Sequence, residues 1–184
     1  MFFLITGGAR SGKSTLAVNI GRSHLGKVIF IATAPNLDDD MSDRIKRHQL
    51  ERPDWETIEE ECEILFHLKR GNSGDLLIVD CITLWVSNLL FHGKTEKEII
   101  DAAIEIGQVA RTSPCAFVMV TNEVGLGIHP ETQLGREYRD ILGKVNQILV
   151  KESTKALFVI SGRVMNLQNF SDIDDFTFQQ GISS

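Results

Sequence analysis

The strongest constraint on this chain is an octapeptide near its N-terminus, Gly7-Gly8-Ala9-Arg10-Ser11-Gly12-Lys13-Ser14. It fits the pattern G-x-x-x-x-G-K-[ST] and stands between an apolar run, Phe2–Thr6, and a helical pattern that begins at Lys13. In that setting the glycines let backbone N–H groups converge on phosphate oxygens, the helix N-terminus adds positive potential, and Lys13 adds a point charge. The Ser14 hydroxyl is then placed to ligate Mg²⁺. We expect a nucleotide phosphate loop here; the alternative is a glycine-rich turn that only opens a helix.

Apolar runs rich in β-branched residues recur along the chain, at Phe2–Thr6, Val28–Ala32, Leu76–Asp80, Ala116–Thr121 and Ala156–Ser161. Each run is nearly continuous rather than alternating, which is typical of strands that are covered on both faces. Helical patterns separate the runs, at Lys13–His24, Met41–Glu51, Ile82–Phe91, Glu96–Arg111 and Leu134–Glu152. The alternation predicts an α/β fold, a RecA-like P-loop NTPase with a mostly parallel sheet flanked by helices. With 184 residues and no linker, we expect one domain over 1–184, and we assign no structure to the polar tail after about Leu167.

Composition narrows the class of protein. Lys and Arg number 19 against 25 for Asp and Glu, so the net charge of −6 disfavours a protein that coats nucleic acid. No apolar run approaches the roughly 20 residues that a membrane helix needs. Cys62, Cys81 and Cys115 are far apart and odd in number, which favours a reducing compartment. We therefore expect a cytoplasmic protein without a membrane span.

An acidic residue at the end of a predicted strand completes the expected metal site. The run Leu76–Asp80 is apolar and ends in a single acid. Phosphate-loop enzymes hold their metal with a carboxylate at the end of a neighbouring strand, so we expect Asp80 to act with Ser14. Capping of the helix that begins near Ile82 is a compatible role. A GTPase switch is not indicated, because the D-x-x-G match at 140–143 falls inside a helical pattern and the chain has no N-K-x-D.

A basic stripe is predicted on the helix over Met41–Glu51. Arg44, His48 and Arg52 follow one another at four-residue steps, so they drift only slowly around a helix. His48 is either a packed, hydrogen-bonded histidine or a nucleophile toward a nucleotide phosphate, with the arginines balancing the developing charge. Spacing alone leaves both interpretations open.

A set of motifs then follows in order: GGARSGKS at 7–14, Ile31-Ala32-Thr33, Asp38–Met41, RIxxH ending at His48, RPxW from Arg52, Asp80–Leu90, TNEVGxGIxP from Thr121, RDxxGxxNQ from Arg139, and Ser161-Gly162. Together they resemble the bifunctional adenosylcobinamide kinase / adenosylcobinamide-phosphate guanylyltransferase family of cobalamin biosynthesis. The resemblance covers about residues 1 to 167. A phosphate loop is shared by many families, whereas TNEVGxGI together with RIxxH is distinctive.

The resemblance implies two reactions and a homotrimer. ATP or GTP phosphorylates the aminopropanol hydroxyl of adenosylcobinamide; GTP then guanylylates a histidine, and GMP passes to the phosphorylated cobinamide to give adenosylcobinamide-GDP. The histidine of RIxxH is His48, so the resemblance favours the nucleophile, with Lys13 as the second catalytic residue. The nucleotide-binding residues implied beyond 7–14 are Ala32, Thr33, Ala34, Gln49, Leu50, Glu51, Arg52, Glu60 and Asp80.

The segment Thr121-Asn122-Glu123 is expected at the border of the site. It ends a predicted strand, and the carboxyl ends of parallel strands meet at one sheet edge, so it should lie beside Asp80. Gly125 and Gly127 permit a tight or mobile loop, and a purely structural turn is the alternative. For the whole chain, the alternative functions are a monofunctional P-loop kinase of a small alcohol and a regulatory nucleotide-binding module.

Overall fold

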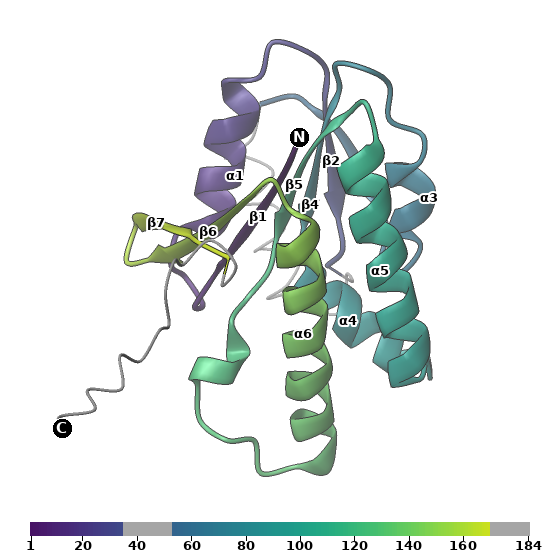
Figure 1. The fold of residues 1–184 in the computed structure, drawn as a ribbon, viewed down its shortest axis with the longest axis vertical. Helices are drawn as coiled ribbons and strands as arrows, with labels where there is room; N and C mark the ends of the chain where they lie inside the picture. The colour runs from purple at the N-terminus through teal and green to yellow at the C-terminus, as the bar shows by residue number, and fades with distance from the viewer. Residues whose placement is uncertain (35–52, 170–184) are drawn as a thin grey trace, which may run out of the picture.

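The computed structural model describes residues 1–34 and 53–169, and these form an α/β sandwich around one sheet (Figure 1). The sheet has seven strands in the order β3-β2-β4-β5-β1-β6-β7. All neighbouring strands are parallel except β6 and β7, which are antiparallel. The strands are β1 (Phe2–Gly7), β2 (Val28–Ala32), β3 (Glu56–Glu59), β4 (Leu76–Asp80), β5 (Ala116–Val120), β6 (Lys155–Ile160) and β7 (Arg163–Leu167).

The helices cover both faces of the sheet (Figure 1). They are α1 (Lys13–Arg22), α3 (Ile64–Leu68), α4 (Ile82–Phe91), α5 (Glu96–Thr112) and α6 (Gln133–Glu152), with a 3₁₀ turn, η1, at Val124–Leu126. Successive residues of β4 show how the layers form: Leu77 and Val79 pack with the α3–α6 layer, whereas Leu76 and Ile78 pack with the α1 layer. Both faces are therefore apolar, which confirms the expectation of strands covered on two sides.

The α/β architecture and all five predicted strands are confirmed, with ends shifted by one residue at most. Four predicted helices are present, and the fifth, Met41–Glu51, lies outside the described residues. Two strands were not predicted. β3 carries the sequence Glu-Thr-Ile-Glu and is a charged edge strand, and β7 follows a two-residue turn at Ser161-Gly162. Both lack the apolar run that marks a strand buried on two faces.

The β6–β7 turn is a tight hairpin. Ser161 and Gly162 have φ angles of 50° and 75°, the left-handed pair that a two-residue hairpin turn requires. The turn also reaches the phosphate loop, because the Gly162 N–H donates to the Ser11 carbonyl at 2.9 Å. In the ranges 1–34 and 53–169, no helix is long and apolar enough to cross a bilayer.

Candidate active site at the carboxyl edge of the sheet

The phosphate loop depends on backbone conformations that glycine adopts readily. Gly7 has a φ of 148° and Gly12 a φ of 105°. A Cβ atom at Gly7 would collide with the carbonyl group of Val159 on the neighbouring strand, so any side chain there would displace the loop from β6. Gly8, Ala9 and Arg10 are exposed at the crown of the loop. The loop is thus closely packed at its base and open where a phosphate would bind.

Lys13 folds back over this loop from the first turn of α1. Only 7% of the residue is exposed, and its Nζ donates a hydrogen bond to the Gly8 carbonyl at 2.6 Å. The ammonium is therefore held near the backbone N–H groups that would surround a phosphate. Ser11 is also 7% exposed, and its hydroxyl has no hydrogen-bond partner among the described residues. A bound anion would supply one.

Asp80 lies at the end of β4, at the same edge of the sheet as the phosphate loop. β5 stands between β4 and β1, and the register pairs Val120 with both Asp80 and Ile5. The next peptide bond, Asp80–Cys81, is cis. Burial, followed by the Asp80 charge, raises the pKa of the Cys81 thiol to about 11, so the thiol stays protonated at neutral pH.

Ser14 and Asp80 have the chemistry of a magnesium site. Both are half-buried, and within the described part of the chain neither the Ser14 hydroxyl nor the Asp80 carboxylate has a hydrogen-bond or ion-pair partner. Hydroxyl and carboxylate oxygens are the donors that Mg²⁺ prefers, usually with several waters retained. The two residues therefore fit the metal that the sequence predicts.

Thr33 joins the ends of β2 and β4. It is fully buried, and its hydroxyl donates to the Cys81 carbonyl and accepts from the Cys81 N–H, both at 2.7 Å. Its carbonyl accepts from the Asn88 side chain at 2.9 Å. These bonds occupy the polar groups of Thr33, while Ala32 and Ala34 beside it are half-buried at the same edge. The nucleotide contacts predicted for these three residues stay predictions.

Glu60 follows β3 at this edge. Its Oε1 accepts from the N–H groups of Cys62 and Glu63, at 2.9 and 2.8 Å, ahead of α3. Burial raises the pKa of the Glu60 carboxyl, whereas these two hydrogen bonds and the nearby His67 lower it. The lowering effects together outweigh burial, so the pKa lies below its usual value. Glu60 is thus a carboxylate that organises the loop before α3, and its predicted nucleotide contact stays a prediction.

A buried polar network holds the Thr121–Glu123 segment. The Thr121 hydroxyl donates to Asn146 Oδ1 at 2.8 Å, and Asn146 Nδ2 donates to the Asn122 carbonyl at 3.0 Å. The Asn122 N–H donates to the Thr83 hydroxyl at 2.7 Å, and the Glu123 N–H donates to the Gly7 carbonyl at 3.2 Å. The segment borders the phosphate loop as expected. The roles of Thr83 and Asn146 were not predicted.

A profile of the family described as cobinamide kinase / cobinamide phosphate guanyltransferase (CobU) matches residues 3–167. The chain belongs to this family. The bifunctional adenosylcobalamin biosynthesis protein CobU of Escherichia coli (strain K12) is 39% identical over 178 residues, which cover 88% of this chain and 97% of that protein. CobU of Salmonella typhimurium is 41% identical over 181 residues, with the same coverage of 88% and 97%. CobP of Pseudomonas aeruginosa is 36% identical over 168 residues, covering 90% and 96%.

Solved structures of low identity share the fold of this CobU-family chain. One, described as a structural study of Project ID PH0250 from Pyrococcus horikoshii OT3, has a TM-score of 0.55 at 12% identity and covers 93% of this chain and 87% of that one. A prototypical ATPase from a type III secretion system has a TM-score of 0.52 at 13% identity and covers 85% and 50%. The likeness supports the P-loop ATPase fold and nothing more specific.

Part of the predicted site of this CobU-family chain cannot be placed. His48 lies outside the described residues, as do Gln49, Leu50, Glu51 and Arg52. The described part brings together the phosphate loop, Asp80, the Ala32–Ala34 segment and Glu60 at one edge of the sheet.

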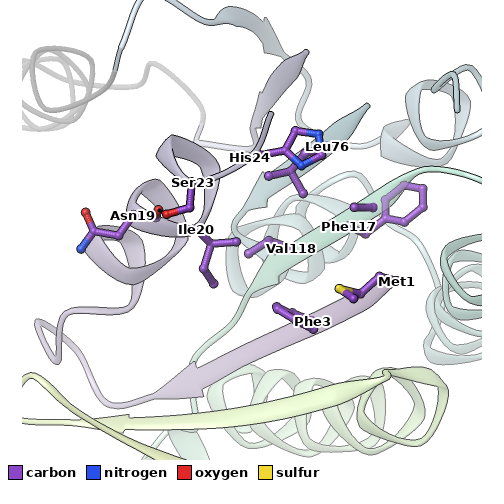
Figure 2. A pocket seen from close by; sticks show the side chains of 10 residues that line it. Met1, Phe3, Asn19, Ile20, Ser23, His24, Leu76, Phe117 and Val118 are labelled. Carbon is purple, nitrogen blue, oxygen red and sulfur yellow. Dashed lines mark hydrogen bonds between the residues drawn. The ribbon is translucent and has the colours of Figure 1, made fainter. Parts of the chain in front are cut away.

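An apolar pocket of about 460 Å³ lies at the amino ends of the strands, away from the phosphate loop (Figure 2). Its lining includes Met1 and Phe3 from the start of β1, Ile20 and His24 from the end of α1 and the turn after it, and Leu76 from the start of β4. Ligands of open α/β sheets bind at the carboxyl ends of the strands, whereas this pocket lies at their amino ends. It is therefore not a candidate for the nucleotide site.

Proposed function

We propose that this protein phosphorylates adenosylcobinamide and then transfers GMP to the product, giving adenosylcobinamide-GDP in cobalamin nucleotide-loop assembly. The family match over residues 3–167 carries this proposal. The phosphate loop supports it, because both reactions consume a nucleoside triphosphate. The relatives are named bifunctional adenosylcobalamin biosynthesis proteins. Their names therefore do not favour the two alternatives, a regulatory module and a kinase of another small alcohol.

In the proposed kinase step, the phosphate loop binds ATP or GTP through its backbone N–H groups. Lys13 stabilises the charge that develops on the transferring phosphoryl group, since its ammonium is already held at the loop. Ser14 and Asp80 would hold Mg²⁺, which supplies charge neutralisation at the phosphates when bound. Ala32, Thr33, Ala34 and Glu60 would border the nucleotide from the neighbouring strand ends.

In the proposed guanylyltransferase step, neutral His48 attacks the α-phosphorus of GTP and pyrophosphate leaves. The phosphoramidate then passes GMP to the phosphate of the phosphorylated cobinamide. Gln49, Leu50, Glu51 and Arg52 would contact the same nucleotide. The spacing of Arg44, His48 and Arg52 supports this step, because a cationic stripe attracts a triphosphate.

The proposed assembly is a homotrimer in the cytoplasm. The exposed apolar side chains Ile160, Val164 and Met165 on the β6–β7 hairpin, 48–56% accessible in the single chain, support a subunit contact there. The three cysteines are free, which fits a reducing compartment. Light scattering during gel filtration should give the mass of three chains; a monomer at micromolar concentration would refute the trimer.

The activity is tested with purified protein, adenosylcobinamide, Mg²⁺ and nucleotide. With ATP alone, mass spectrometry should detect phosphorylated cobinamide, and subsequent addition of GTP should convert it to the GDP-linked product. Chelation of divalent ions should stop both conversions. Phosphorylation without any GMP transfer would instead identify a monofunctional kinase.

A further inference from the structure

We propose that Glu123 is the catalytic base of the kinase step and that Asn146 is the residue that positions it. This inference rests on the proposed kinase activity and assigns the acceptor side of the same site. The phosphate loop and Asp80 account for the nucleotide and its metal, but they leave the attacking hydroxyl without a proton acceptor.

The sheet order places Glu123 between the two halves of the nucleotide site. β5 lies between β1, which leads into the phosphate loop, and β4, which ends at Asp80. The chain after Val120 therefore emerges between the loop and the metal carboxylate. In the proposed step, a side chain at this position would reach the hydroxyl that attacks the γ-phosphate.

The backbone of Glu123 is fixed on two sides. Its N–H donates to the Gly7 carbonyl at 3.2 Å, which joins it directly to the phosphate loop. The preceding residue, Asn122, is held through its N–H by Thr83 and through its carbonyl by Asn146, at 2.7 and 3.0 Å. Thr83 and Asn146 are 6% exposed, so this support is shielded from water.

The Glu123 carboxylate is available for chemistry. No hydrogen bond or ion pair within the described ranges occupies it, in contrast to the Glu60 carboxylate, which accepts from two backbone N–H groups. A Cβ atom at Gly125 would lie 3.2 Å from Glu123 Oε1, so the carboxylate lies against this glycine and a side chain at position 125 would crowd it. The residue is half-buried at the open edge of the sheet.

The proposed step balances without a further reactant. The acceptor oxygen forms a bond to the γ-phosphorus, and the bond from the γ-phosphorus to the β–γ bridging oxygen breaks. The nucleoside diphosphate leaves with that electron pair. The hydroxyl proton passes to the Glu123 carboxylate and then to solvent, so the carboxylate is restored. General-base groups of this kind contribute about 100-fold or more to rate.

The test compares phosphorylation of adenosylcobinamide by wild type and Glu123→Gln, with Glu131→Gln as the matched control. Glu131 is an exposed carboxylate in the same connection between β5 and α6. Glu123→Gln should lower kcat for phosphorylation by about 100-fold or more. The KM for ATP should change little, and labelling of the protein by GMP from GTP should persist, because that step needs no acceptor hydroxyl.

The outcomes separate this inference from the proposed function. A wild-type protein that does not phosphorylate cobinamide refutes the proposed function itself. A wild-type protein that does so, with Glu123→Gln equally active, refutes only the assignment of Glu123. Retained GMP labelling also shows that the variant is folded.

Asn146 is tested with Asn146→Asp, which removes the amide donor to Asn122, and with Gln147→Glu as the exposed control on the same helix. Asn146→Asp should lower kcat about tenfold in wild type but change it little in the Glu123→Gln background, because the two residues act through one path. Effects that multiply in the double variant would show that Asn146 acts independently and would refute its positioning role.

Discussion

At the scale of single residues, the candidate site combines side chains that a sequence motif predicts with others that come together only in the folded chain. The positions of Lys13, Ser14 and Asp80 could be predicted, because the first two belong to a loop pattern and the third ends an apolar strand. Thr83, Thr121 and Asn146 could not, since their hydrogen bonds join residues 25 and 38 positions apart. Only the family resemblance indicated Glu60 as a nucleotide-binding residue. Its hydrogen bonds to the loop before α3 were not predicted.

Lys13→Ala tests the residue that the motif indicates most strongly. Removing the ammonium takes a fixed positive charge from the transferring phosphoryl group, so phosphorylation of cobinamide should fall by about 100-fold or more at saturating ATP. Steady-state kinetics measure this. Lys97→Ala is the control, because Lys97 is exposed on α5 and forms an ion pair with Asp101. Near wild-type turnover in Lys13→Ala would refute the role of the phosphate loop.

At the scale of elements, α6 is the helix with the clearest sequence pattern, and its Asn146 forms hydrogen bonds with Thr121 and Asn122 at the site. Its amphipathic pattern predicted a helix over Leu134–Glu152, and the observed helix begins one residue earlier. The amphipathic pattern does not predict the hydrogen-bond partners of α6. Asn146 holds the end of β5, and the Tyr138 hydroxyl donates to the Thr83 carbonyl of α4 at 3.3 Å. β3 and β7 were not predicted, because edge strands need no continuous apolar run.

The contact between α6 and α4 is tested by the ionisation of Tyr138, the only tyrosine in the chain. Burial raises the pKa of its phenol from 10.0 to about 12. The neutral phenol is favoured in the fold, so its stabilisation is present below pH 10 and is lost as the pH rises toward 12.

Ultraviolet absorbance of the phenolate measures this titration, with circular dichroism as a parallel record of folding. In the folded protein the phenol should ionise near 12, or together with loss of the helical signal if unfolding comes first. In denaturant it should ionise near 10. A phenol that ionises near 10 while the protein stays folded would contradict the packing of α6 on α4.

At the scale of the whole molecule, the two proposed reactions would use one nucleotide site. The sheet edge collects the phosphate loop, Asp80 and the Thr121–Glu123 segment, and the family match assigns the chain to enzymes named for both a kinase and a guanyltransferase. The kinase half is supported by the family match and by the phosphate loop with Lys13. The transferase half rests on one histidine of the RIxxH motif, so it needs the most direct evidence.

That evidence is the covalent GMP adduct. After incubation with α-labelled GTP and Mg²⁺, mass spectrometry should place one GMP on the peptide that contains His48, in a linkage that acid breaks far more readily than alkali. His48→Asn should abolish this label and GMP transfer while preserving phosphorylation of adenosylcobinamide, because the acceptor hydroxyl attacks the γ-phosphate without a carrier. Label that persists in His48→Asn, or that maps to another residue, would contradict the account.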